Sequence, residues 1–167
     1  MRKLVRTVLL TGCLLLAGCG FHLREQAEVP EALKRVRLEI ADPGSLLYRD
    51  LPAALQRAGA SVQEQAGSDV ATLRIPISTL GTEALSVGAT ARVREYTMRY
   101  RVELEAVDAA GTVILPRQVI ELSRDYTFDE TQALGVAAQE DELRKQLQRD
   151  MVQAILRRLE ALGRAAG

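Results

Sequence analysis

Few residues in this 167-residue chain are of the types that carry out chemistry. The only histidine is His22, and the two cysteines are Cys13 and Cys19. These residues cannot assemble a histidine-based triad or a metal cluster, both of which need several such groups in one place. Gly81 and Gly88 do not have the spacing of a phosphate-binding loop. The sequence therefore predicts no catalytic residue, no metal site and no enzyme.

Carboxylates are the remaining route to catalysis, because two of them can act as a general acid and a general base. Acidic residues are common on protein surfaces, and they indicate catalysis only where a cleft or a perturbed pKa accompanies them. The acidic residues that could supply such a pair are Asp125, Asp129, Glu130, Glu140, Asp141 and Glu142. Positions on a strand face, at a helix cap or at a helix start account better for them.

The first residues of the chain have the layout of a secretory signal. Basic residues occur at positions 2–6, an apolar stretch covers 8–16, and small residues stand immediately before Cys19. The apolar stretch is too short to cross a bilayer as a permanent helix. Residues 1–18 are therefore predicted to be a signal peptide.

Cys19 is the residue on which we expect covalent chemistry. The sequence Leu-Ala-Gly-Cys at 16–19 resembles a bacterial lipobox, in which the cysteine thiol takes a diacylglycerol and the freed amine takes a further acyl chain such as palmitate. Each buried methylene contributes about 0.8 kcal/mol, so a triacylated residue anchors a protein durably. Cys13 leaves with the signal, so no disulfide is expected. Gly20, where inner-membrane retention typically uses Asp, favours the outer membrane.

Composition limits the partners of the mature chain. Residues 19–167 keep 19 of the 22 basic residues and all 22 acidic residues, a formal charge of −3. Bulk charge therefore gives no reason to expect nucleic acid as a partner. The chain has no tryptophan and an aromatic content of 4%, which argues against an aromatic platform for sugars or bases. No cofactor is expected apart from the covalent lipid.

Hydrophobic periodicity divides the rest of the chain into elements. Residues 19–34 show no sustained period and are predicted to be a lipidated tether. A period of two over 35–40 indicates a strand. Helical spacing from Leu47 to Ala58 indicates a helix that stops at Gly59, and Pro52 fits its first turn if the helix begins near Asp50.

The pattern from Val70 to Phe128 is that of β-strands. Pro76 favours an edge position for the first of them. The small residues at 81–91 indicate a loop or a loosely held hairpin connection. The clearest strand is 96–106, where large apolar side chains alternate with charged ones, as in a sheet with one buried and one solvated face. A last strand, interrupted near Pro116, completes the set.

A long amphipathic helix ends the chain, with Gly163 as its expected stop. Its apolar stripe is Leu143, Leu147, Met151, Ile155, Leu159 and Leu162. We expect the middle of this stripe to pack against Tyr100, Val102 and Leu104.

Residues 35–167 are therefore predicted to form a single α+β domain. It is expected to be a two-layer sandwich of about four strands, with a largely antiparallel or mixed sheet and two helices on one face, in the order β-α-β-β-β-α.

Short motifs in this chain resemble a known family. Cys19 is followed by Gly-Phe-His-Leu-Arg, Glu95-Tyr96 opens the alternating strand, and Ser-Arg-Asp-Tyr at 123–126 closes the last one. Ala133-Leu134 precedes the acidic start of the final helix. In this order the motifs resemble the lipopolysaccharide-assembly lipoprotein LptE (RlpB) family.

This resemblance implies an outer-membrane lipoprotein that faces the periplasm or sits in a barrel lumen. It implies partnership with the β-barrel LptD, as plug and assembly factor, in delivering lipopolysaccharide. From the residues alone, a lipid-anchored periplasmic adaptor or chaperone for other envelope proteins, without lipopolysaccharide binding, is the alternative.

A basic cluster is the candidate contact for lipopolysaccharide. Arg92 and Arg94 follow the small-residue segment, while Arg99 and Arg101 share the polar face of the next strand. Guanidinium groups bind phosphates such as those of lipid A in a bidentate, charge-assisted way. The alternative for Arg99 and Arg101 is cross-strand pairing with carboxylates such as Glu121 or Asp125.

Overall fold

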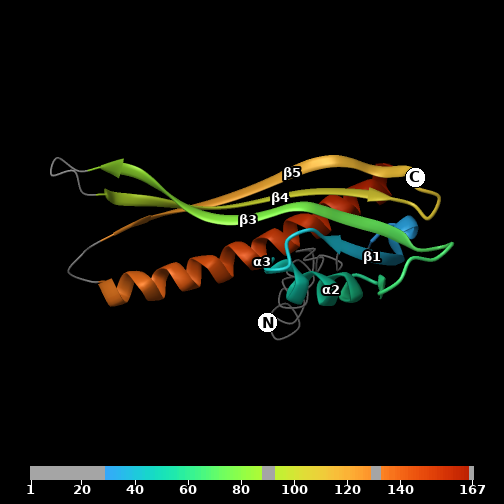
Figure 1. The fold of residues 1–167 in the computed structure, drawn as a ribbon, viewed down its shortest axis with the longest axis horizontal. Coiled ribbons are helices and arrows are strands. Elements are labelled where there is room, and N and C mark those ends of the chain that lie inside the picture. The colour runs from blue at the N-terminus through green and yellow to red at the C-terminus, as the bar shows by residue number, and fades with distance from the viewer. Residues whose placement is uncertain (1–28, 88–92, 129–132, 166–167) are drawn as a thin grey trace, which may run out of the picture.

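The computed structural model describes residues 29–87, 93–128 and 133–165. Its sheet has five strands in the order β2-β1-β3-β4-β5. β1 is parallel to both of its neighbours, whereas β3, β4 and β5 form an antiparallel meander (Figure 1). The strands are β1 Arg35–Ile40, β2 Ser61–Gln63, β3 Ala71–Val87, β4 Val93–Val107 and β5 Val113–Thr127.

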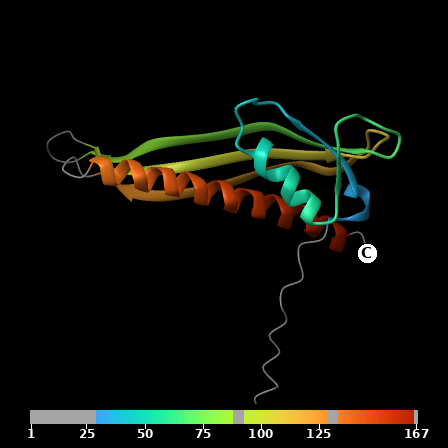
Figure 2. The same ribbon diagram turned by 90° about the horizontal axis from the view of Figure 1, so that it is seen from below.

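Helices cover one face of this sheet only. α2 spans Leu47–Arg57 and α3 spans Ala133–Ala165, and a short 3₁₀ turn, η1, spans Glu31–Leu33. Both helices lie on the same side of the sheet, with α2 beside the C-terminal half of α3 (Figure 2). The predicted two-layer α+β architecture is therefore confirmed, with one strand more than expected.

The core between the layers is the one that periodicity predicts. Leu147 and Ile155 of α3 are completely buried, in one hydrophobic cluster with Tyr100, Val102 and Leu104 of β4. The alternation along β4 places every second side chain in this core. The two periods, 3.6 along α3 and 2 along β4, thus identify the faces that meet.

The molecule has two distinct ends. At one of them, the entry end, the chain enters beside the C-terminal end of α3: a Cβ placed on Gly163 would lie 3.3 Å from the Cβ of Pro30. The N–H of Val29 also donates a hydrogen bond to the carbonyl of Ala58 (3.1 Å). At the other, the far end, β3 and β4 finish their pairing and α3 begins at Ala133 (Figure 1).

The start of the domain differs from the expectation. The sequence pattern places residues 29–34 in the tether, but Val29 and Leu33 are 3% and 0% exposed. Only three residues, Pro30, Glu31 and Ala32, separate these two buried side chains, and so short a segment shows no sustained period. The domain therefore includes these residues.

β2 is an element that the sequence pattern does not predict. It is a strand of three residues, which is too short to show a period.

The small-residue segment also differs from the expectation, whereas the edge position predicted from Pro76 is confirmed. β3 continues to Val87, so residues 81–87 are strand rather than loop, and residues 88–91 of this segment lie outside the described residues. Pro76 lies in a bulge of the β3–β4 pairing, between Arg74 and Ile77, and β1 pairs with β3 only as far as Ile75. The proline thus marks the point where β3 changes from an inner strand to an edge strand, where its missing N–H is tolerated.

Two helix boundaries need correction as well. α2 begins at Leu47, so Pro52 lies inside the helix rather than in its first turn. α3 continues through Gly163 to Ala165. The glycine does not stop this helix; it provides the close approach of Pro30. Gly59, with φ 86°, does follow the end of α2 as predicted.

Candidate binding surfaces

The face of the sheet opposite the helices, which we call the open face, carries the candidate arginines that the structure describes. Arg99 and Arg101 project from this face of β4, next to each other in register. Arg92 lies outside the described residues, and Arg94 belongs to β4 without a described side chain. Cys19 also lies outside the described residues. The structure therefore brings together two of the four arginines and leaves the lipid-binding role of all four a prediction.

Both described arginines are paired with carboxylates. The Nη1 of Arg99 donates to Oε1 of Glu121 (2.6 Å), and its Nη2 lies 3.5 Å from Oε2 of Glu83. The Nη2 of Arg101 donates to Glu103 (2.7 Å), and its Nη1 lies 3.7 Å from Glu121. Cross-strand pairing with Glu121, the alternative that the sequence left open, is what the structure shows. A phosphate would have to compete with this carboxylate for both guanidinium groups.

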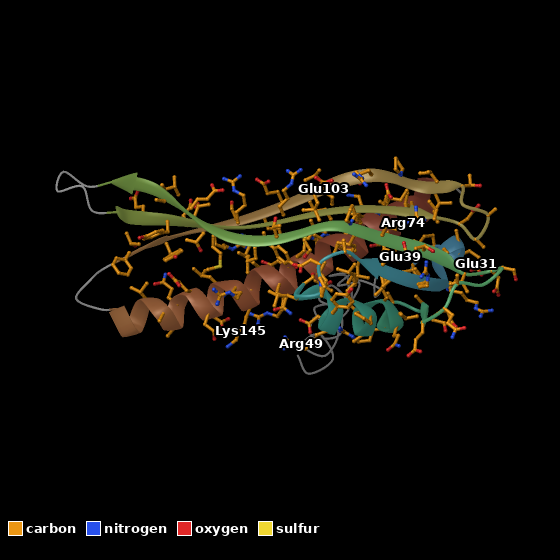
Figure 3. All side chains as sticks on the ribbon, viewed as in Figure 1. Glu31, Glu39, Arg49, Arg74, Glu103 and Lys145 are labelled. Carbon is orange, nitrogen blue, oxygen red and sulfur yellow. The ribbon has the colours of Figure 1, made fainter. Side chains whose placement is uncertain are left out.

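These pairs belong to one continuous chain of charges across the open face. Every member lies within 4.0 Å of the next, and arginines alternate with glutamates, so the set is electrically neutral. Figure 3 shows Glu39, Arg74 and Glu103 of this set in place on the ribbon. We call it the ionic network; in spatial order it consists of Arg37, Glu39, Arg74, Glu105, Arg117, Glu103, Arg101, Glu121, Arg99 and Glu83.

Glu103 is the least exposed charge of the ionic network. Its side chain is 12% exposed, and it contacts Arg101 at 2.7 Å and Arg117 at 3.9 Å. A carboxylate withdrawn this far from water needs its partners, because an uncompensated charge there would be costly. Sequence reasoning finds the alternating charges of β4 but not the network, since its links depend on the register of β4 with β3 and β5.

A small cavity opens on the helix side. It has a volume of about 230 Å³, and its lining includes Ser45, Ser78, Tyr100 and Arg144. The two serine hydroxyls are 2.7 Å apart, and the hydroxyl of Ser78 lies 3.1 Å from that of Tyr100. Burial raises the pKa of Tyr100, so this hydroxyl stays protonated. The chain of hydroxyls satisfies its own hydrogen bonds and provides no general base.

An aromatic cluster fills the core near the far end. The rings of Tyr96 and Tyr126 stack with centroids 5.5 Å apart, and Phe128 meets Tyr96 edge to face at 6.1 Å. The hydroxyl of Tyr126 donates to Glu140 of α3 (2.6 Å). Burial, followed by this hydrogen bond to a carboxylate, raises the pKa of Tyr126 to about 12. This contact ties the beginning of α3 to β5.

Two further observations concern metals and membranes. Within residues 29–87, 93–128 and 133–165, no group of three or more His, Cys, Asp or Glu side chains is arranged to hold a metal ion. In the same part of the chain, no helix has the length and apolar character needed to cross a bilayer.

The fold and the open face define a class of protein: a small two-layer α+β domain with helices on one face of its sheet and paired charges on the other. A family model places it further. Residues 33–159 match the model of the LptE family, described as lipopolysaccharide-assembly. The chain belongs to the LptE family.

Relatives with this name are similar over almost the whole chain. A protein of Yersinia pestis named LPS-assembly lipoprotein LptE is 30% identical, with 95% of this chain and 77% of that protein covered. One of Photorhabdus laumondii with the same name is 28% identical, with 93% and 87% covered. The match thus extends beyond the described domain.

Solved structures show the same fold. The solution structure of lipoprotein B from Nitrosomonas europaea has a TM-score of 0.75 and 33% identity, covering 87% of this chain and 94% of that one. The crystal structure of rare lipoprotein B from Shewanella oneidensis has a TM-score of 0.62 and 26% identity, covering 79% and 96%.

Proposed function

We propose that this protein assembles lipopolysaccharide in the outer membrane, as the lipid-anchored partner of the β-barrel LptD. Membership of the LptE family and relatives named for lipopolysaccharide assembly support this role. In this role the domain binds and positions other molecules and performs no covalent chemistry.

The ionic network is the observation that supports a place inside a barrel. The lumen of a membrane β-barrel is polar, in contrast to its lipid-facing outside. A plug must therefore present a polar surface without adding a large net charge to a confined space. Five arginines and five glutamates paired across the open face meet both conditions.

Removal of the protein tests this role most directly. We expect its loss to lower the amount of correctly assembled LptD, and to make the outer membrane permeable to large or hydrophobic compounds. Immunoblotting of folded LptD and an antibiotic sensitivity assay measure these effects. Normal LptD and an intact barrier would favour the adaptor or chaperone. Co-purification from detergent-solubilised outer membrane separates the two: a stable complex with one large barrel supports the proposal, and many weak partners support the adaptor.

Within this role, we assign direct lipopolysaccharide contact to Arg92 and Arg94 before Arg99 and Arg101. The second pair already neutralises carboxylates, so its capacity for phosphate is reduced. Reversal of Arg92 and Arg94 to Glu should weaken binding of purified lipopolysaccharide and leave the melting temperature unchanged. The matched control reverses Arg35 and Arg57, two exposed arginines at the entry end. Unchanged binding by the first variant would eliminate this contact without affecting the proposed barrel partnership.

The anchor is the remaining part of the proposal. Cys19→Ala should abolish acylation and release the protein from the outer-membrane fraction. Mass spectrometry of the mature N-terminus is the direct measurement, and an unmodified cysteine in the wild-type protein would contradict it. Because Val29 is the first described core residue, the domain of the variant should remain folded.

A further inference from the structure

We propose that Arg157 and Arg158 form a binding site for the headgroup phosphates of anionic phospholipids in the bilayer that holds the lipid anchor. This inference rests on the proposed anchor at Cys19, but it requires neither LptD nor lipopolysaccharide. It concerns α3 near the entry end, whereas the candidate lipopolysaccharide contacts lie on β4 and before it.

The two arginines are exceptional in their lack of partners. In the part of the chain that the structure describes, Arg157 and Arg158 have no hydrogen bond and no ion pair. Every other arginine with a described side chain makes at least one such contact. The nearby carboxylates are already engaged: Asp150 with Arg124, and Glu160 with Arg164. Two adjacent guanidinium groups are thus left free for an external anion.

The helix itself does not explain these charges. Basic residues are favoured in the last turn of a helix, where they offset its dipole, but the effect fades beyond that turn. Arg164 occupies the last turn of α3, and Arg157 lies about two turns earlier. Core packing does not explain them either, because both side chains are exposed.

A cavity with an apolar floor lies beside the pair. It has a volume of about 310 Å³ and lies between α3 and β5. Its lining combines the two arginines with small or apolar side chains, namely Ile120, Ala154 and Ala161. Positions 154, 157, 158 and 161 have the spacing of one helical stripe, so both guanidinium groups border the same hollow. A phosphate that carries apolar chains matches this lining better than an inorganic ion does.

The position of the site in the molecule supports a bilayer lipid as its ligand. Arg158 precedes Gly163 by five residues, about 7.5 Å along the helix axis, and Gly163 contacts Pro30, where the described chain begins. From Pro30 back to Cys19 the chain spans at most about 40 Å. The arginines therefore lie at the end of the domain from which the chain runs back to the predicted anchor. The beginning of α3, 24 residues before Arg157, lies about 36 Å farther along the axis.

Vesicle binding tests this site without the acyl chains. The mature chain 19–167 carrying Cys19→Ser is mixed with vesicles of phosphatidylethanolamine and phosphatidylglycerol, and the bound fraction is measured by flotation. Vesicles of phosphatidylethanolamine and phosphatidylcholine are the uncharged comparison. Each basic residue near an anionic surface contributes about 1 kcal/mol. Substitution of both arginines, R157Q with R158Q, should therefore lower partitioning to the anionic vesicles about 30-fold.

Two further variants separate the site from general charge. R49Q with R149Q removes the same charge from arginines that already have partners, and should leave partitioning nearly unchanged. Ala161→Glu places a carboxylate three residues after Arg158 and four residues after Arg157, where it can pair with both. This variant should reduce partitioning although both arginines remain. Since all of these side chains are exposed, the melting temperatures should agree, which shows that each variant is folded.

Four outcomes decide the proposal. A loss confined to the R157Q, R158Q and Ala161→Glu variants, and to anionic vesicles, supports it. Equal binding to both kinds of vesicle would overturn it, as would an equal loss in the R49Q, R149Q control. Full displacement by millimolar inorganic phosphate would show an anion site without lipid selectivity, and would also overturn it. None of these results depends on LptD, so the proposed function stands or fails separately.

Discussion

The entry end and the far end of this domain are stabilised in different ways. At the entry end, two helices cover the sheet, and Leu51 of α2 and Leu73 of β3 are completely buried. At the far end, α3 covers the sheet alone, and β3 is an edge strand whose residues Thr82 and Ala84 are exposed although they share the helix-facing side with Leu80. The comparison shows that stability is concentrated at the entry end.

The largest effect should come from the shared core. Ile155→Ala removes a completely buried side chain that packs between the layers, and should lower the free energy of unfolding by about 2–5 kcal/mol. Leu143→Ala, a partly buried position toward the far end, should cost less than about 2 kcal/mol. Urea unfolding of both variants is the measurement. Equal losses would mean that α3 is held uniformly and would contradict the comparison.

The open face offers a second, smaller contrast. Glu103→Gln leaves Arg101 and Arg117 without a largely buried carboxylate, and should cost about 1–2 kcal/mol. Glu83→Gln is the control, since Glu83 is the last member of the ionic network and its side chain is 66% exposed. Exposed pairs contribute at most about 1 kcal/mol and weaken in salt. Thermal melts at two salt concentrations distinguish the variants; a larger loss at Glu83 would contradict the ranking.

Tyr126 tests the attachment of α3 near the far end. Its pKa of about 12 in the folded protein exceeds the unfolded value of about 10. The neutral hydroxyl is therefore favoured by folding, and its stabilisation is complete below about pH 10 and lost as the pH rises through about 12. Tyr126→Phe removes the hydrogen bond to Glu140 and should cost about 1 kcal/mol at neutral pH.

The variant also changes the pH profile. Wild-type stability should fall more steeply between about pH 10 and 12 than that of Tyr126→Phe, and unfolding curves across this range measure the difference. Tyr48→Phe is the control: Tyr48 belongs to α2, is 48% exposed, and donates its hydroxyl to the backbone carbonyl of Ile40 instead of to a carboxylate. Parallel profiles for the wild type and Tyr126→Phe would contradict the assignment.

The smallest change in stability should come from Gly→Ala substitutions, which we expect to stabilise the domain at one end and destabilise it at the other. A Cβ added to Gly135, near the beginning of α3, would meet no heavy atom within 4 Å. Gly135→Ala should therefore stabilise the domain by about 0.5 kcal/mol through helix propensity. Gly59 has φ 86°, so Gly59→Ala should cost about 1 kcal/mol. Precise thermal melts measure both, and a gain at Gly59 would contradict the backbone argument.

Sequence reasoning succeeds wherever a period persists for several turns or residues. β4 and the apolar stripe of α3 are identifiable because their patterns repeat over many residues, from 96 to 106 in β4 and from 143 to 162 in α3. β2 and the packing of Val29 and Leu33 cannot be predicted from the sequence, because two or three residues are too few to show a period. Pro76 correctly indicates an edge position, but a single strand that is inner at one end and an edge at the other cannot be inferred without knowing how far β1 extends.

The candidate site can be predicted only in part from the sequence, for a related reason. The alternation along β4 places Arg99 and Arg101 on one polar face, and pairing with Glu121 is an alternative that the sequence allows. The ionic network requires the register of neighbouring strands, which depends on the bulges in the meander. Arg157 and Arg158 likewise lack partners because the nearby carboxylates are ion-paired with other arginines, which the sequence does not show. Pair partners are a property of the assembled sheet and helix layer.

The contact between Pro30 and Gly163 also determines when this domain can form. The first described residues pack beside the last turn of α3, and α3 supplies the completely buried Leu147, Met151 and Leu159. During synthesis at about 5–20 residues per second, the 33 residues of α3 take about 2–7 s to add. Until then α2 alone covers the sheet, and the core of the nascent chain is not closed. The topology thus delays closure of the core until α3 has been synthesised, which would keep a chain with the predicted signal peptide open for passage through a translocation channel.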